Sequence, residues 1–329
     1  MQQFSGYEYL LIDVANCYGL DKETWQQRIA WATAQDSKLE KWDVDADSPI
    51  LFRKAVRALR KAQKGEPINH VMGLDATASG IQLMAAMSGC ESSAKATNLI
   101  YTGKREDVYQ RVANKMSEML DKDVPRSALK KPIMTFFYGS KAQPKRVLGE
   151  GEALKAFHDT MKKVLAGPYQ LMELFQKCWN SSATHYHWFM PDGHNVYIPV
   201  TQTVDRRLEI DEADHLRCTY RCTEVKALDR GLALAANITH SVDAYICRQM
   251  ILRCQKVGVP VAPVHDCFYA HPNHMNTVRQ TYLELMIELS QSNMVQGILK
   301  QVLGNYRFYY SKINPSIGSL MKDSEYALS

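Results

Sequence analysis

Two short apolar segments, far apart in the chain, each lead into an aspartate, and this arrangement constrains the fold more than any other feature of the sequence. Residues 70–75 (HVMGLD) and 257–270 (VGVPVAPVHDCFYA) are predicted to be β-rich, and the second has a tight turn at His265–Asp266. An aspartate that closes a strand or sits in a turn often serves only local backbone chemistry. An aspartate carried by an apolar strand, however, must be paired or bound to a metal.

Helical spacing of apolar residues dominates the rest of the chain. The predicted helical stretches are residues 1–64, 105–120, 150–180 and 227–257. Residues 188–225 alternate in polarity and contain the turn Pro191-Asp192-Gly193, so they are predicted to form strands and hairpins. The sequence has no obvious repeat and no long linker, which favours one compact unit.

The composition excludes several classes of protein. Of 329 residues, 46% are apolar and 23% are charged, which is typical of a globular chain and not of a disordered tail, a collagen-like fibre or a mucin-like stalk. No apolar run approaches the roughly 20 residues that cross a bilayer, and the N-terminus does not resemble a signal peptide. Eight scattered cysteines indicate a soluble protein of a reducing compartment. The net charge of +5 is compatible with nucleic-acid binding but is weak support for it.

A basic helix is predicted between the two aspartates, from Pro125 to Gly139. Arg126 and Lys130 are four residues apart and therefore project from one helix face. Two cations on one face suit a polyphosphate, and Tyr138 at the helix end is placed to pack against a base or sugar. The alternative interpretation is a solvated basic face with a tyrosine in the core.

Together the three segments are more specific than any one of them. Two aspartates on separate strands, with a cationic helix between them in the sequence, match the needs of two-metal phosphoryl transfer, in which carboxylates hold two Mg²⁺ ions. Arginine and lysine would balance the charge of the triphosphate.

At these residues the sequence resembles the single-subunit RNA polymerases of bacteriophages and mitochondria. The resemblance is carried by three motifs: Asp75-x3-Ser79-Gly80-Ile81-Gln82, Arg126-x3-Lys130-x7-Tyr138-Gly139, and His265-Asp266-Cys267-Phe268. Further similar segments, in the family's order, are Tyr9–Arg28, Pro191-Asp192-Gly193, Ala236–Ser241 with Asp243, and Ser324–Ser329.

The resemblance implies an α+β, mostly helical fold: the palm and fingers of a right-hand polymerase, with a small antiparallel palm sheet. Residues 1–329 would form one catalytic unit without the family's N-terminal domain and thumb. Its expected parts are residues 1–90 (start of the palm), 91–190 (fingers), 191–226 (a hairpin of the kind that reads promoter DNA) and 227–329 (palm and C-terminal tail).

The resemblance also implies residue roles. Asp75, Asp266 and the carbonyl of Ala76 would bind two Mg²⁺ ions, and Lys22, Arg126 and Lys130 would hold the triphosphate. Lys130 would donate a proton to the pyrophosphate, and Tyr138 and Gly80 would lie against the sugar, with Tyr138 stacking near the insertion site. The residues expected to contact nucleic acid are His240, His265, Tyr109, Arg206 and Arg207.

Two other functions remain open at this stage. A family A DNA polymerase carries a glutamate at the position of Gly80, where it blocks a ribose 2′-hydroxyl, and usually another at the position of Cys267. A primase-like enzyme belongs to the same alternative. An inactive nucleic-acid-binding subunit is the third hypothesis, which the retained aspartates and cations disfavour.

Three local features carry separate expectations. Pro132 lies inside the basic helix, where it lacks an N–H group and is expected to bend the helix or delay its start. A zinc site at His215, Cys218 and Cys222, or at Cys178, His185 and His187, fits no standard spacing, so ordinary strand residues are favoured. The hairpin containing Arg206 and Arg207 has a plain surface ribbon as its alternative.

The partners that the resemblance implies are a DNA template, nascent RNA and nucleoside triphosphates. A second polypeptide would supply the thumb and N-terminal domain in a split enzyme, and a single-stranded DNA-binding protein is a further candidate partner. The expected location is the cytoplasm of an infected host cell.

Overall fold

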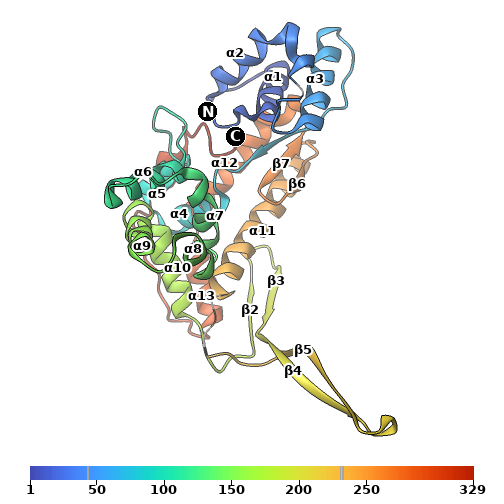
Figure 1. The fold of residues 1–329 in the computed structure, drawn as a ribbon. Helices are drawn as coiled ribbons and strands as arrows, with labels where there is room; N and C mark the ends of the chain where they lie inside the picture. Colours follow the sequence, from blue (N-terminus) through green and yellow to red (C-terminus); the bar gives the residue numbers. More distant parts are fainter. Residues whose placement is uncertain (43, 230, 232) are drawn as a thin grey trace.

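The computed structural model describes residues 1–42, 44–229, 231 and 233–329. The described chain is mostly helical, with small antiparallel sheets, as the sequence predicts. The N-terminal helices lie at one end of an elongated molecule, and a long β-hairpin projects from the other (Figure 1). No helix in the described ranges is both long and apolar enough to span a bilayer.

The N-terminal helices pack around a small core of their own. They are α1 (Gly6–Ala15), the π-helical turn Asn16–Leu20, α2 (Trp25–Ala34), the 3-10 turn Asp36–Lys41 and α3 (Pro49–Gln63). Capping boxes start α1 at Ser5 and α2 at Thr24, because each cap side chain and the residue three positions later bind each other's backbone N–H groups. Helix α3 buries Phe52 and Leu59 in this core and turns its basic residues outward.

The sheet that carries both aspartates has the strand order β1-β7-β6. Strand β1 (Met72–Asp75) pairs antiparallel with β7 (Cys267–Ala270), which pairs with β6 (Ala262–Val264). Asp75 faces Cys267 in the register, and Val264 faces Cys267 across the predicted two-residue turn. Residues that are almost 200 positions apart are thereby brought onto neighbouring strands.

A buried helix follows β1 and forms the centre of the main core. Helix α4 (Ser79–Ser88) is covered from Ile81 onward and packs against α10, α11 and α12. Gln82 on α4 is fully buried, and its amide binds the carbonyls of Thr97 and Ala327 and the Tyr282 hydroxyl. The other helices around this core are α5 (Glu91–Ala96), α11 (Ala233–Lys256), α12 (Met275–Gln291), α13 (Met294–Val302) and α14 (Gly318–Met321), with the 3-10 turn Pro272–His274 before α12.

The long helix predicted for residues 227–257 is α11, which begins at Ala233 in the structure. Arg230 and Leu232, which the prediction included, lie outside the described residues.

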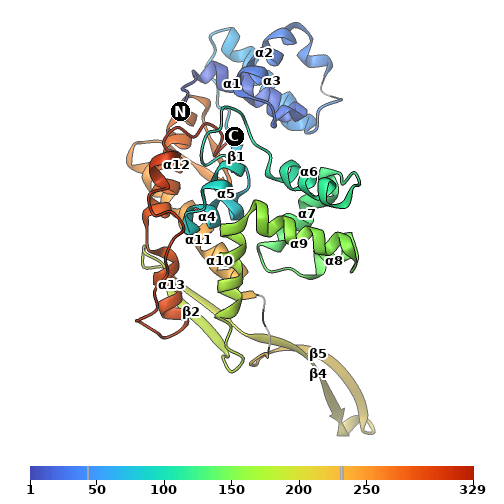
Figure 2. The ribbon, with the colours of Figure 1, turned by 90° about the vertical axis from the view of Figure 1, so that its left-hand side faces the viewer.

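A second group of helices flanks the core on one side (Figure 2). It comprises α6 (Val108–Leu120), α7 (Arg126–Phe136), α8 (Ala142–Leu148), α9 (Glu152–Val164) and α10 (Ala166–Lys177). Helix α7 runs from Arg126 through Pro132 to Phe136, so the expected late start is wrong. Pro132 is buried there, together with Leu129, Ile133 and Phe136.

Two hairpins follow α10, as the alternating polarity predicts. Strand β2 (His185–Phe189) pairs with β3 (Asn195–Pro199) across the turn at Pro191-Asp192-Gly193. Strand β4 (Thr201–Ile210) pairs with β5 (Leu216–Val225), with the short turn Asp211–Ala213 at the tip. The β4–β5 hairpin extends away from the helices in both ribbon views (Figures 1 and 2).

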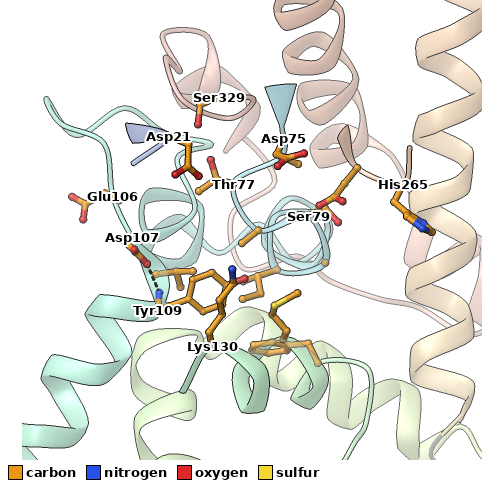
Figure 3. Close-up of a pocket in the computed structure, with 18 of the residues that line it drawn as sticks. Asp21, Asp75, Thr77, Ser79, Glu106, Asp107, Tyr109, Lys130, His265 and Ser329 are labelled. Carbon is orange, nitrogen blue, oxygen red and sulfur yellow. Dashed lines mark hydrogen bonds between the residues drawn. The ribbon is translucent and has the colours of Figure 1, made fainter. Parts of the chain in front are cut away.

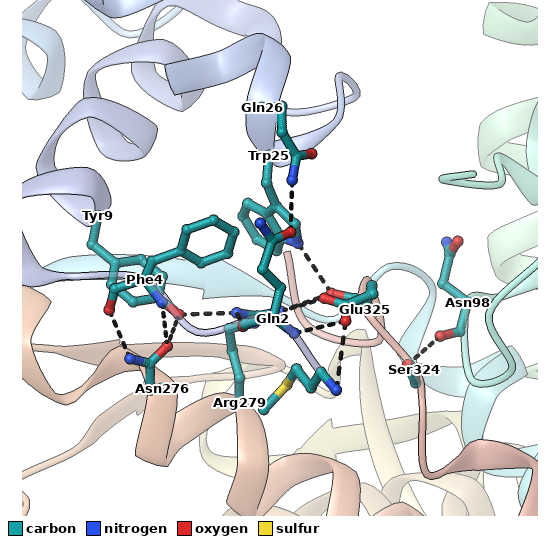
Figure 4. A network of polar contacts seen from close by, with 11 residues as sticks. Gln2, Phe4, Tyr9, Trp25, Gln26, Asn98, Asn276, Arg279, Ser324 and Glu325 are labelled. Carbon is teal, nitrogen blue, oxygen red and sulfur yellow. Dashed lines mark hydrogen bonds and ion pairs between the residues drawn. The ribbon is translucent and has the colours of Figure 1, made fainter. Parts of the chain in front are cut away.

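The two ends of the chain lie side by side and are joined by a polar network (Figure 4). Buried Arg279 donates to the carbonyls of Gln2 and Glu325 at 2.9 and 3.0 Å. The C-terminal segment then runs along β1: Thr77 N donates to Ala327 O at 3.3 Å, and Ser329 N donates to Asp75 O at 2.9 Å. The strand that carries Asp75 is therefore supported by the tail as well as by β7.

Candidate active site

A cavity of about 380 Å³ lies where β1, the β6–β7 turn, α7 and α11 meet. Figure 3 shows Asp75 and Ser79 on one side of it and Tyr109 and Lys130 on the other. The predicted site residues that line this cavity are Lys22, Asp75, Ala76, Gly80, Tyr109, Arg126, Lys130, Tyr138, His240, His265 and Asp266. Segments separated by up to 244 positions, from Lys22 to Asp266, thus converge, as the motifs predict.

Asp75 is the last residue of β1, and Asp266 lies in the turn that joins β6 to β7, the strand paired with β1. Ala76 N donates to the carbonyl of Asp266 at 3.0 Å, which ties the end of β1 to the β6–β7 turn. Burial, and after it the nearby charge of Asp75, raise the pKa of Asp266. His265 opens the turn at φ 56, a left-handed conformation that non-glycine residues seldom adopt and that is concentrated at functional sites.

These residues fit a divalent cation. Mg²⁺ prefers oxygen ligands, and it is usually held by one or two carboxylates together with substrate phosphates. Asp75 at the end of β1 and Asp266 in the neighbouring β6–β7 turn supply carboxylates, and burial, with a smaller contribution from the charge of Asp75, raises the pKa of Asp266. Asp75 and Asp266 would hold the metal, and the backbone carbonyl of Ala76, the next residue after Asp75, would be a further oxygen ligand.

A third carboxylate, Asp243, lines the same cavity, although the sequence did not single it out as a ligand or catalytic residue. It projects from α11 and accepts a hydrogen bond from the Ser79 hydroxyl at 3.4 Å. Burial, and secondarily the charge of Asp266, raise the pKa of Asp243 to about 6. The cavity is therefore more acidic than the two motif aspartates alone would make it.

Cations occupy the opposite wall. Arg126 Nε donates to Asp107 Oδ2 at 2.6 Å, and the guanidinium lies over the Tyr109 ring at 5.5 Å. Asp107 uses its other oxygen to cap α6, accepting from the backbone N–H groups of Tyr109 and Gln110. Lys22 forms an ion pair with Asp21. The predicted cations are thus present, and two of them are already held by neighbouring carboxylates.

Tyr138 and His240 form the aromatic part of the wall. Their rings stack with centroids 4.6 Å apart and 3° between the planes. Burial raises the pKa of Tyr138 to about 12 and lowers the pKa of His240, so both rings are neutral near pH 7. A Cβ atom on Gly80 would lie 2.8 Å from the Tyr138 hydroxyl oxygen, so a glycine is needed where this tyrosine closes over α4.

Arg206 and Arg207 are the predicted site residues that the structure does not bring to the cavity. Both lie on β4, and Arg206 forms an ion pair with Glu224 of β5. Their proposed contact with nucleic acid would have to occur on the projecting hairpin, away from the carboxylates (Figure 2).

Neither zinc hypothesis is supported. Within the described ranges, the residues that converge like ligands are Glu209, Asp211 and His215, all exposed at the hairpin tip, and this group contains no cysteine. Cys178 is buried, while His185 and His187 are exposed and stack loosely with centroids 6.1 Å apart.

Several lining residues were given no role from the sequence, although three of them (Asp21, Asp243 and Ser329) lie in the segments that carry the resemblance; the other three are Arg105, Glu106 and Asp107. Arg105, Glu106 and Asp107 precede a helix and look like ordinary capping residues. One feature of the sequence could have indicated Asp243. It follows His240 by three positions, and this spacing places the two side chains on the same side of α11.

Two carboxylates at the edge of one sheet, facing cations and a stacked aromatic pair, are typical of enzymes that transfer phosphoryl groups. A family model described as DNA-dependent RNA polymerase matches residues 2–147 and 146–327. The chain therefore belongs to the DNA-dependent RNA polymerase family, and the resemblance found in its motifs is confirmed.

Individual relatives agree. The chain is 24% identical over 355 residues to DNA-directed RNA polymerase 1, mitochondrial, of Arabidopsis thaliana, covering 90% of the chain and 36% of the relative. It is 23% identical over 368 residues to the DNA-directed RNA polymerase of Pseudomonas phage phiKMV, covering 91% and 44%. A mitochondrial enzyme of Mus musculus is 22% identical, with 90% and 29% covered. The chain thus spans less than half the length of these relatives.

Proposed function

We propose that this chain is the catalytic part of a DNA-directed RNA polymerase, which adds ribonucleotides to the 3′-end of an RNA on a DNA template. One observation carries the proposal: a single cavity gathers Asp75, Asp266, Arg126, Lys130 and Tyr138 from segments far apart in the sequence. A family member that had kept only a binding role would not need two neighbouring carboxylates, one at the end of β1 and one in the β6–β7 turn, opposite cations.

Each part of the cavity has a role in this proposal. Asp75 and Asp266 would hold Mg²⁺, which when bound would offset the charge of the triphosphate and favour ionisation of the attacking 3′-hydroxyl. Arg126, which Asp107 positions through the guanidinium Nε, and Lys22 hold the triphosphate through their N–H groups. Lys130 lies on the α7 face that also carries Arg126 and donates a proton to the departing pyrophosphate.

The stacked rings of Tyr138 and His240 are proposed to contact the sugar of the nucleotide and the end of the duplex. Tyr138 would lie against the ribose of the incoming nucleotide, and His240 and His265 would contact the end of the primer–template duplex. The Tyr138 hydroxyl lies so close to Gly80 that no side chain fits at this position, which supports ribonucleotides over the family A DNA polymerase alternative, in which a glutamate stands there.

In the right-hand description, β1, β6, β7 and the helices α4, α11 and α12 form the palm, and α6–α10 form the fingers. The β4–β5 hairpin is the candidate for contacts with promoter DNA. A second polypeptide that supplies further domains and a single-stranded DNA-binding protein stay predictions from the resemblance.

The test is extension of an RNA primer annealed to a DNA template with Mg²⁺, using rNTPs or dNTPs. The chain is assayed alone and with the proteins encoded beside its gene. Ribonucleotide extension under either condition supports the proposal, and activity only with a neighbour supports the split enzyme. Efficient extension with dNTPs alone would favour the DNA polymerase alternative. If the folded protein extends the primer under none of these conditions, a non-catalytic role is favoured.

A further inference from the structure

The hydroxyl of Ser79 occupies a junction between three polar side chains. It donates a hydrogen bond to Asp243 Oδ1 at 3.4 Å. It also interacts with the Tyr138 hydroxyl and with the Asp266 carboxylate. Ser79 begins α4, Asp243 lies on α11 and Tyr138 follows α7, so one small hydroxyl couples three separate elements of the cavity wall.

Hydrogen-bond valence gives this junction a direction. A serine hydroxyl has one proton to donate and two lone pairs, whereas an ionised carboxylate only accepts. When the Ser79 proton is directed to Asp243, Ser79 Oγ is left as an acceptor for the neighbouring Tyr138 hydroxyl. The chain of donors then runs from Tyr138 to Ser79 to Asp243, and a charged acceptor at its end strengthens each step.

This direction decides what Tyr138 presents to the cavity. With its proton turned toward Ser79, the Tyr138 oxygen has its remaining lone-pair capacity free to accept a hydrogen bond from a ligand. That oxygen lies beside Gly80, where a Cβ atom would be only 2.8 Å away, so Ser79 is the α4 neighbour that contacts it while position 80 contributes no side chain. A ribose 2′-hydroxyl can donate to this oxygen, and a deoxyribose has no such donor.

The stack beneath Tyr138 fixes the position of the same oxygen. His240 lies three residues before Asp243 on α11, and its ring packs parallel to Tyr138 at 4.6 Å. Helix α11 therefore holds the tyrosine ring through His240 and orients its hydroxyl through Asp243 and Ser79.

We propose that Asp243 is a positioning residue that sets the sugar preference of the site, by orienting the hydroxyls of Ser79 and Tyr138 so that the cavity favours a nucleotide with a 2′-hydroxyl donor. The inference rests on the proposed function, since it concerns the same nucleotide site. It differs from a role for Asp243 as a third metal-binding carboxylate, which would affect ribo- and deoxyribonucleotides alike.

The test compares wild type with Asp243→Asn and Ser79→Ala. Asparagine keeps the size of the side chain, but its amide can donate to the Ser79 hydroxyl and so reverse the direction of the hydrogen bonds between Tyr138, Ser79 and residue 243. Asp159→Asn on α9, outside the cavity lining, is the matched control, and circular dichroism checks folding. The readouts are kcat and KM for single additions of GTP and dGTP on a primed scaffold, and the Kd of each nucleotide with Mg²⁺.

The loss of one directed hydrogen bond predicts a fall in the GTP-over-dGTP preference of about tenfold in Asp243→Asn. Nearly all of the change should come from GTP. Ser79→Ala should lower the preference by a similar factor. The double variant should lower it little further, because both substitutions interrupt the same chain of hydrogen bonds. The Mg²⁺ concentration for half-maximal activity should stay unchanged.

An unchanged preference in a folded Asp243→Asn protein would overturn the inference, as would equal losses for both nucleotides with a raised Mg²⁺ requirement. If wild type fails to extend the primer, the proposed function fails separately. The Kd values then decide the inference, and equal binding of GTP and dGTP by wild type would contradict it.

Discussion

The rings of Tyr138 and His240 stack almost parallel, 4.6 Å apart, and join the end of α7 to the middle of α11. Since burial lowers the pKa of His240, the imidazole is neutral near pH 7 and packs as an aromatic surface. The stack fixes the tyrosine over Gly80, at the point where the proposal places the sugar.

Replacement of His240 by alanine should remove the support of Tyr138. We expect incorporation to fall about tenfold, because a stacked aromatic pair contributes on the order of 1 kcal/mol beyond burial. His240→Phe keeps a ring and should retain more activity than His240→Ala. Steady-state incorporation by the two variants measures the difference, and equal losses would show that His240 acts through its nitrogens and not through the stack.

Addition of one methyl group at Gly80 should displace Tyr138. In Gly80→Ala the new Cβ atom would meet the tyrosine hydroxyl oxygen at 2.8 Å, closer than a normal contact. We expect a higher KM for ribonucleotides. Tyr138→Phe removes the atom in conflict, so the double variant should lose less than the sum of the single losses. Fully additive losses in KM would contradict the close approach of these two residues.

Asp107 has two tasks that substitutions can separate. Asp107→Asn keeps a good cap for α6 but loses the ion pair to Arg126, so KM for the triphosphate should rise severalfold with little loss of thermal stability. Asp107→Ala should in addition destabilise the protein by about 1 kcal/mol. Thermal unfolding and KM measure the two effects. A lower KM in Asp107→Asn would instead show that the ion pair competes with the triphosphate.

Lys312 gives a prediction for pH. Its ammonium group donates to the Leu289 carbonyl at 3.4 Å and to the Ser290 carbonyl, and burial lowers its pKa from the ordinary 10.5 to about 8. Between these values the unfolded chain binds more protons than the folded one, so the free energy of unfolding should rise with pH.

The rise should be on the order of 1–3 kcal/mol and should be absent from Lys312→Met. Lys322 is exposed, so the control variant Lys322→Met should keep the rise of the free energy of unfolding with pH. Urea unfolding at pH 7, 8.5 and 10 measures the difference, and parallel curves for wild type and Lys312→Met would contradict the account.

Much of the site could be predicted from the sequence because its residues lie in short segments with strong local signals. The strand ending at Asp75, the turn at His265–Asp266 and the α7 face with Arg126 and Lys130 each carry their chemistry within a few residues. The effect of Pro132 was harder to foresee, since local rules disfavour a helix that tertiary burial of Leu129 and Ile133 nevertheless maintains.

Other features depended on tertiary contacts that no local pattern reveals. Asp243 becomes part of the site only because α11 crosses behind α4, and Asp107 becomes a partner of Arg126 only because α6 and α7 pack together. Likewise, nothing in the sequence of the C-terminal tail indicates that it runs beside β1 and binds the backbone of Asp75.

Primer extension by wild type, Asp75→Asn and Asp266→Asn tests the central claim most directly. Asparagine keeps the shape of each side chain but removes the charge that would hold Mg²⁺, so we expect rates to fall about a thousandfold or more while the circular dichroism spectrum is retained. Extension by either folded variant at a rate near that of wild type would contradict the assignment of this cavity as the catalytic site.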